Sequence, residues 1–490
     1  MSAPQSIPVK DAAAGPPVDR ISSSEIDGSL RWPAVALLTG SIAWLILGTF
    51  LALLAAIKLH KGDFLADCPW LTVGRIRPAS ANAILYGFAS QAAFGVLYWL
   101  LCRLGNVRFI YQVAVLIAGK LWNIGVLVGV VAILAGASNG FEWLEMPRYA
   151  AAILFASYIV LGLCAVGTFQ LRRVRDLYPT QWFLFAALFW FPWLYTAANY
   201  LLVLEPVRGV FQSVVAAWFA GGFLRLWLGL VALGALYYFL PKMTGKPLYS
   251  GPLAAFAFWS ILFFGSWSGV ATLQGAPVPR WVPSVGVAST LCLLAPLVSN
   301  GLNWYLTSCY LDLFKKNATA RFIVFGAACY LLVGLTELAL AAPAVDRLTG
   351  LSLAGIGVKG LAIHGFIGSV LLGAIYHVLP RVLEIEWSSQ KLIRIHFGLH
   401  ATGVLLIFVG LLIGGLRQGM KLADPATAFI TIAKGTAPFV GLSTLGILLL
   451  LAGQVLLAIN LFKLLRIFVQ PTLQTICAEY CCGSVKEVKP

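Results

Sequence analysis

Long apolar stretches follow one another along the whole chain, and short polar segments separate them. Each stretch is at least as long as the ~20 residues that a helix needs to cross the hydrocarbon core of a bilayer. We therefore predict an all-α protein, an integral membrane twelve-helix bundle. The twelve predicted spans cover residues 32–59, 80–104, 109–136, 149–171, 180–204, 212–240, 251–274, 284–311, 319–342, 359–383, 396–419 and 437–468.

The composition agrees with this pattern, since 60% of the residues are hydrophobic, 11% are charged and the mean hydropathy is +0.89. These values exclude a soluble globular protein. Residues 1–31 are polar, rich in Pro and Ala, and contain no apolar core of a signal peptide, which predicts a disordered cytoplasmic tail. Residues 32–468 form the twelve-span domain, and residues 469–490 form a C-terminal cytoplasmic tail. Reduced thiols are expected at Cys477, Cys481 and Cys482, with palmitoylation or a soft metal as alternatives.

The net charge of +16 follows the predicted topology. The N-terminal tail, the even-numbered loops and the C-terminal tail hold 20 Lys and Arg residues, whereas the odd-numbered loops hold 12. Because cytoplasmic segments carry the excess of Lys and Arg, both termini are predicted to be cytoplasmic. The lipid bilayer is therefore the expected partner of this basic chain, and no nucleic acid is expected.

Three motifs carry a resemblance to a known family. Residues 71–83 read Leu-Thr-Val-Gly-Arg-Ile-Arg-Pro-Ala-Ser-Ala-Asn-Ala, residues 140–147 read Gly-Phe-Glu-Trp-Leu-Glu-Met-Pro, and residues 237–242 read Tyr-Tyr-Phe-Leu-Pro-Lys. In order, they resemble the start of the second span, the acidic loop after the third span and the link between spans six and seven of haem-copper oxidase subunit I. The cbb-type cytochrome c oxidase catalytic subunit is the most similar branch, and the resemblance covers about residues 32–468.

The resemblance implies two haems and one copper, which the family holds with histidines. Ser80 stands where the second-span motif of the family has its haem ligand, and Gly265 stands where the family has a tyrosine linked to a copper ligand. Imidazole is the usual ligand of haem iron and copper inside a protein. We therefore predict no catalytic residue and no bound cofactor. The six positions without the family's ligands are Ser80, Gly221, Ala271, Thr272, Val358 and Gly360.

Five histidines remain in the chain. His364 follows Gly360 by one helical turn on the same face, so it is the one mid-span candidate for a displaced haem. His396 and His400 have the i, i+4 spacing that could hold a metal on one helix face, but no carboxylate or thiolate is near them in sequence. A structural hydrogen bond is the expected role of His364, whereas His396 and His400, at the start of a span beside a charged loop, are expected to form an interfacial pair.

Three charged side chains lie well inside predicted spans, namely Lys120, Arg225 and Glu337. A charge facing lipid is costly, so each is expected to face protein or water and to have a partner. Glu337 matches a glutamate that the resembling family keeps in its ninth span. Arg225 lies on the span that would supply a copper ligand. We predict that Arg225, together with Lys120, neutralises Glu337 inside the former active site; local pairing of each charge is the alternative.

These observations predict a cytochrome c oxidase subunit I-like protein of the bacterial inner (plasma) membrane. It would serve as a non-catalytic structural or regulatory component of a respiratory electron-transfer complex, with partners such as a membrane-anchored cytochrome c. One alternative is an active terminal oxidase or nitric oxide reductase with relocated haem ligands. A second alternative is a proton or ion channel on the oxidase scaffold.

Overall fold

The computed structural model describes residues 21–308, 314 and 317–481, with the side chains of 471–481 outside that description. This part of the chain is helical and contains no strand. Its helices are α1 (Ser23–His60), η1 (Pro69–Leu71), α2 (Val73–Asn82), η2 (Ala83–Ser90), α3 (Gln91–Gly105), α4 (Gln112–Ala135), α5 (Arg148–Gln170), α6 (Pro179–Asn199), η3 (Tyr200–Leu204), α7 (Phe211–Gly222), η4 (Phe223–Gly229), α8 (Leu230–Thr244), α9 (Gly251–Ser268), η5 (Gly269–Leu273), α10 (Trp281–Cys292), α11 (Leu294–Ser308), α13 (Ala318–Ala341), α14 (Pro343–Thr349), α15 (Ala354–Gly360), η6 (Leu361–Gly368), α16 (Ser369–Leu383), α17 (Gln390–Leu422) and α18 (Phe429–Cys481).

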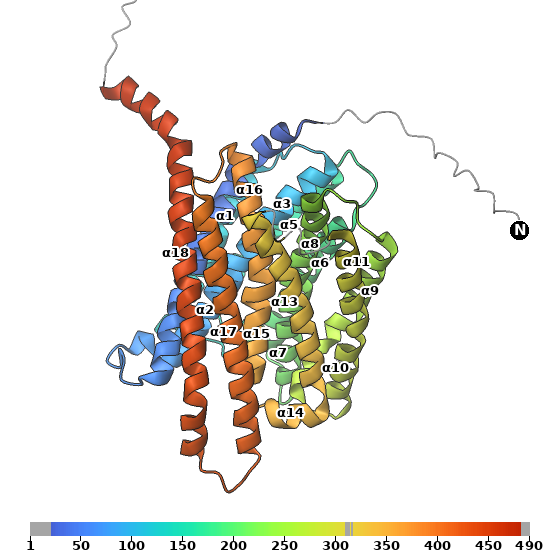
Figure 1. Ribbon diagram of the computed structural model, residues 1–490, viewed down its shortest axis with the longest axis vertical. Coiled ribbons are helices and arrows are strands. Elements are labelled where there is room, and N and C mark those ends of the chain that lie inside the picture. Colours follow the sequence, from blue (N-terminus) through green and yellow to red (C-terminus); the bar gives the residue numbers. More distant parts are fainter. Residues whose placement is uncertain (1–20, 309–313, 315–316, 482–490) are drawn as a thin grey trace, which may run out of the picture.

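Several of these helices join end to end, and the described residues contain twelve helices that are long and apolar enough to cross a membrane. The predicted twelve-helix bundle is therefore confirmed. Figure 1 shows the helices running side by side along one axis, with both described chain ends at one end of the bundle and the short α14 at the other. The C-terminal helix α18 packs along α17 at one edge and extends beyond its neighbours.

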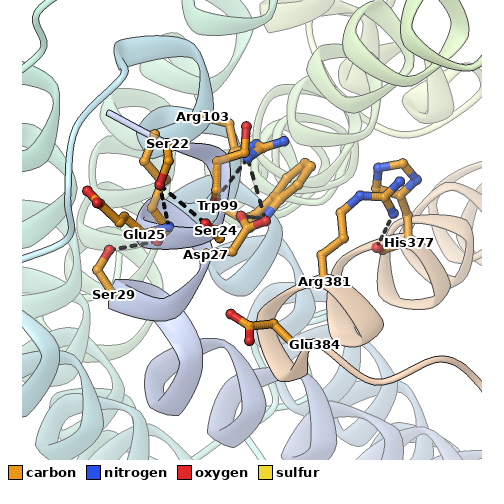
Figure 2. Close-up of polar contacts among 12 residues, drawn as sticks. Ser22, Ser24, Glu25, Asp27, Ser29, Trp99, Arg103, His377, Arg381 and Glu384 are labelled. Atoms are coloured by element: carbon orange, nitrogen blue, oxygen red, sulfur yellow. Dashed lines mark hydrogen bonds and ion pairs between the residues drawn. The ribbon is translucent and has the colours of Figure 1, made fainter. Parts of the chain in front are cut away.

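Helix α1 begins at Ser23, upstream of the predicted start of the first span at residue 32. The Ser22 side chain accepts a hydrogen bond from the Glu25 backbone N–H, which caps the first turn. The buried Asp27 then accepts a 2.9 Å hydrogen bond from Trp99 Nε1, and its other oxygen lies 3.5 Å from Arg103 (Figure 2). These polar contacts to α3 explain why the helix extends into residues that a hydropathy pattern treats as a tail.

The C-terminal tail also departs from the predicted boundary. Helix α18 continues to Cys481, so most of residues 469–490 is helical. Cys482 lies outside the described residues, as do the side chains of Cys477 and Cys481, and the expected state of these thiols stays a prediction.

Four spans contain a π-helical segment, in which the backbone hydrogen bonds skip one extra residue. These segments are η2 in the second span, η3 in the fifth, η4 in the sixth and η6 in the tenth. Such segments are rare and frequently occur at functional sites. Two of them, η2 and η4, each pack against η6 inside the bundle. Residues of η4 and η6 line the cavity of the candidate site.

The loop between α4 and α5 folds back onto the second span. Asn82, from the motif at residues 71–83, donates a 2.7 Å hydrogen bond from Nδ2 to Glu145 Oε2, and the Tyr86 hydroxyl donates to the Trp143 carbonyl at 2.8 Å. Glu145 is buried, and this burial raises the pKa of its carboxyl from the ordinary value of 4.5, an effect that the Asn82 bond opposes only in part. The acidic loop thus covers the interior of the bundle, and the Glu145 carboxyl is buried in doing so.

We predict that Glu145→Gln removes a pH-dependent cost of folding. A carboxyl whose pKa is raised in the folded state binds its proton more tightly there than in the unfolded chain. Its contribution to the free energy of unfolding is therefore greatest at a pH below its unfolded-state pKa and declines as the pH rises toward the raised pKa. The thermal unfolding temperature of the native protein should therefore fall, relative to the variant, as the pH increases from about 4.5. If the unfolding temperatures of the native protein and of Glu145→Gln change in parallel with pH across this range, the raised pKa of Glu145 is contradicted. Glu205→Gln, at an exposed loop position, is the control.

Candidate functional site

A cavity of about 400 Å³ lies inside the bundle between spans six, seven, nine and ten. Its lining includes Gly221 from α7, Ala271 and Thr272 from η5, and Val358 from α15. These are four of the six positions at which the resembling family has metal ligands. The fold therefore brings together in space four positions that lie on three different spans.

Glycine contacts leave no room for a larger residue on one wall of this cavity. A Cβ atom added at Gly221 would lie 2.4 Å from the Cα of Gly269, and one added at Gly269 would lie 2.5 Å from the Ala217 carbonyl oxygen. Both obstacles are backbone atoms, so a side-chain rotation cannot relieve them. A histidine at residue 221 would require α7 and η5 to move apart.

An ion pair occupies the same region. Arg225 in η4 places its Nη2 atom 2.6 Å from Oε2 of Glu337 in α13, and its Nη1 donates to the Ser268 hydroxyl. The two charged side chains are 22% and 31% exposed, and both line the cavity. The Arg225 stem passes Gly265, where an added Cβ would lie 3.0 Å from Arg225 Cδ. The arginine thus uses space that a tyrosine at residue 265 would need.

The predicted contact between Arg225 and Glu337 is present, but the predicted contribution of Lys120 is not. Lys120 is exposed on the outer face of α4, and no ion pair joins it to a described residue. Helical rise alone placed Lys120 at a suitable depth. It could not tell which way the residue faces, and here the helix turns it outward.

Further charged groups lie where the cavity approaches the α14 end of the bundle. Lys359 Nζ lies 2.6 Å from Glu142 Oε1 and 5.5 Å from the centre of the Trp143 ring. Asp346 of α14 also lines the cavity, and burial raises the pKa of its carboxyl above the ordinary value of 3.8. Neither Asp346 nor the pair of Lys359 with Glu142 was predicted from the sequence. The acidic residues of the 140–147 motif were the available signal for Glu142.

The remaining two family positions, Ser80 and Gly360, are not among the residues that line this cavity. The Ser80 hydroxyl donates a 2.7 Å hydrogen bond to the Gly48 carbonyl of α1. A Cβ added at Gly48 would lie 2.6 Å from Ile84, so α1 and the second span are in close contact beside Ser80. At Gly360 the nearest atom to an added Cβ is Ile407 Cγ2 at 3.4 Å, which is ordinary contact.

The histidines form hydrogen bonds to neighbouring hydroxyls. His396 Nδ1 pairs with the Tyr376 hydroxyl at 2.8 Å, and His400 Nε2 pairs with the Ser369 hydroxyl at 2.9 Å. The pair is therefore not interfacial as expected: both side chains are buried, and their second ring nitrogens have no partner among the described residues. His364 lies in η6, partly buried. Within the described ranges, no three His, Cys, Asp or Glu side chains are grouped closely enough to hold a metal ion.

Comparison with known proteins identifies the class of this bundle. Residues 33–449 match the family model described as "Cytochrome C and Quinol oxidase polypeptide I". The fold is similar to that of a solved heme-copper terminal oxidase dimer, with a TM-score of 0.66, 15% sequence identity and coverage of 87% of this chain and 84% of that one.

Two curated relatives agree with this class. The chain is 24% identical to a "Cytochrome c oxidase subunit 1 homolog" of Azorhizobium caulinodans, over 89% of this chain and 83% of that protein. It is also 24% identical to the "Cbb3-type cytochrome c oxidase subunit CcoN1" of Stutzerimonas stutzeri, over 86% and 92%. The chain belongs to the cytochrome c and quinol oxidase polypeptide I family, and it is a cytochrome c oxidase subunit I-like membrane protein.

Family membership corrects one prediction. A chain without any cofactor was expected, whereas the family and the solved heme-copper oxidase of the same fold point to a protein class that binds haem and copper. That expectation is wrong, because it treated the absence of the family's ligand residues as the absence of haem and copper. The residues at the six positions nevertheless do not fit haem iron or copper. Gly, Ala and Val carry no side-chain donor, and the Ser80 and Thr272 hydroxyls each donate a hydrogen bond to a backbone carbonyl.

We predict that Gly221→Ala destabilises the protein whereas Gly360→Ala does not. The methyl group at residue 221 meets the Gly269 backbone, and overpacking of this kind costs about 1–3 kcal/mol. At residue 360 the methyl group has room, so the higher helix propensity of Ala should leave stability unchanged or raise it by up to about 1 kcal/mol. Thermal unfolding in detergent measures both. Equal effects of the two substitutions would contradict the close contact at Gly221.

Proposed function

We propose that this protein does not itself reduce oxygen and acts as a structural or regulatory component of a respiratory electron-transfer complex. The observation that carries the proposal is the Arg225–Glu337 ion pair in a cavity lined by Gly221, Ala271, Thr272 and Val358. In the resembling family these positions supply the ligands around which oxygen chemistry takes place. Here a guanidinium and a carboxylate neutralise one another instead.

The backbone contact between Gly221 and Gly269 supports the same proposal. Restoring a ligand there would need a shift of two helices, because the obstacle is Cα and carbonyl atoms. A single reversion is therefore not expected to restore the copper side of the centre. The proposed role depends on the shape of the bundle and on its contacts with other subunits.

A haem that is bound to this chain would need donors other than the six family positions. His364 is the candidate within the spans, and activity that depends on it is the first alternative to the proposed role. Haem supplies electron transfer and oxygen binding when an imidazole holds its iron. The contribution of this chain would be the orientation of that ring by η6.

The proposed partners are other subunits of a respiratory complex, including a membrane-anchored cytochrome c. The proposed location is the bacterial plasma membrane, with both termini cytoplasmic. Support comes from the charge asymmetry of the loops and from the position of both described chain ends at one end of the bundle (Figure 1).

A second candidate function is proton conduction, which the arrangement of carboxylates favours. Glu337 and Asp346 both line the cavity, and Asp346 lies on the α14 side of it. Carboxyl groups inside a membrane protein commonly mark proton pathways. The ion pair with Arg225 opposes this role, because the guanidinium already occupies the Glu337 carboxylate at 2.6 Å.

We predict no oxygen uptake by the purified protein, with its co-purifying subunits, when reduced cytochrome c is the electron donor. The cbb3-type oxidase of Stutzerimonas stutzeri serves as the active control. His60, an exposed residue at the end of α1, is the control histidine. Cyanide-sensitive uptake that His364→Ala abolishes and His60→Ala leaves intact would overturn the proposal in favour of a relocated haem. Proton flux into liposomes that is lost in Glu337→Gln and retained in Glu205→Gln would instead favour the channel.

A further inference from the structure

A second, larger cavity lies at the opposite end of the bundle from α14, near the end that carries both described chain ends. Its volume is about 880 Å³. Residues from α8, α13, α16 and α17 and from the segment between α16 and α17 line it. This cavity is separate from the candidate site, and nothing in the proposed function uses it.

Four cationic side chains line the cavity, each from a different helix. They are Lys242 of α8, Arg321 of α13, Arg381 of α16 and Arg394 of α17. One carboxylate, Glu386, accompanies them. None of the four cations forms an ion pair with a described residue. Helix packing has therefore gathered an excess of positive charge around one opening.

Hydrogen bonds to backbone carbonyls fix the orientation of two of the four cationic side chains. Arg381 Nη1 donates a 2.7 Å hydrogen bond to the His377 carbonyl, and Arg321 Nε donates to the Phe314 carbonyl at 3.1 Å. Trp387, which is buried in the wall, donates from Nε1 to the Tyr376 carbonyl at 2.8 Å. These bonds orient two guanidinium groups, each of which has further N–H donors. A preorganised guanidinium group can bind a phosphate through two parallel N–H···O hydrogen bonds.

The size and place of the cavity define the ligand further. Ligand pockets usually enclose about 300–1,000 Å³, so a phosphorylated small molecule or a lipid headgroup would fit. Basic pockets between membrane helices are also known to hold anionic lipid headgroups. Lys242, Arg381 and Arg394 are exposed, so an anion can reach them without a structural change.

We propose that this basic cavity binds a phosphate-bearing anion, which is either the headgroup of an acidic lipid or a soluble phosphate compound. Bound phosphate offsets part of this positive charge and links the helices that carry it, α8, α13, α16 and α17. The ligand would thereby tighten the bundle at this end.

The test uses the full-length protein in two arms. In the soluble arm, pyrophosphate binding is measured by calorimetry with the protein in nanodiscs of phosphatidylcholine alone. In the lipid arm, phosphatidylglycerol retained from mixed micelles is measured by native mass spectrometry. Binding in either arm is expected to weaken about fivefold for each cation that is removed, in Lys242→Gln, in Arg394→Gln and, cumulatively, in the double variant. The arm that responds identifies the source of the phosphate.

Lys391→Gln is the matched control, because Lys391 is an exposed cation on α17 at the same end of the bundle but does not line the cavity. Its affinity should equal that of the native protein. An unchanged unfolding temperature of Lys242→Gln and Arg394→Gln shows that these variants are folded. The proposal is overturned if neither arm shows binding, if the cavity variants bind as tightly as the native protein, or if Lys391→Gln weakens binding equally.

Discussion

A charge inside an apolar bundle must be paired, and the pair between Arg225 and Glu337 is the interaction on which the candidate site depends. Removing either ion from water is expensive, and the cost is recovered only when geometry and additional hydrogen bonds are good. Here the two groups lie 2.6 Å apart, and Ser268 accepts a further bond from the guanidinium. The pair joins residues that are 112 positions apart in the chain. It thus connects the sixth span to the ninth across the cavity.

The absence of side chains at two glycines makes this arrangement possible. Gly265 gives the Arg225 stem a path, and Gly221 allows α7 to meet η5 backbone to backbone. Small residues of this kind let membrane helices approach closely. Arg225 also lies in a π-helical segment, whose extra residue per turn changes the direction of its side chain relative to a regular helix. The two glycines and the π-helical segment η4 thus together allow Arg225 to reach Glu337.

The second cavity shows the opposite treatment of charge. None of its four cations forms an ion pair with a described carboxylate, and they lie at the end of the bundle, where water and lipid headgroups are available. Arg225, inside the bundle, pairs with Glu337 of the same chain. The four cations at the end of the bundle are proposed to bind a phosphate-bearing anion from outside the chain. The two sites thus differ in where the compensating charge comes from.

Much of the fold and part of the site could be predicted from the sequence. Twelve apolar stretches were enough for the span count, since hydropathy reports directly on bilayer crossing. The scarcity of charge inside spans selected Arg225 and Glu337. Hydropathy could not reveal that Ser22 and Asp27 extend α1, nor that Lys120 faces outward, because these depend on capping and on helix rotation.

The cofactor prediction failed for a different reason. Individual residues such as Ser80 and Gly221 show which ligands are absent, but the class of a protein is carried by the whole chain. The match over residues 33–449 therefore outweighed the six positions in assigning the family. The basic cavity was missed because its four cations come from four helices that are distant in sequence.

The most direct test of the account is a double-mutant cycle on Arg225 and Glu337. The unfolding free energies of Arg225→Leu, Glu337→Leu and the double variant are compared with that of the native protein in detergent. Each single variant leaves an unpaired charge in the cavity and should cost about 2–3 kcal/mol, a figure below that of a fully buried pair because both groups are partly exposed. The double variant should be more stable than the sum of the two losses predicts, by about 2 kcal/mol. Strictly additive losses would contradict the claim that this pair holds the centre of the site together.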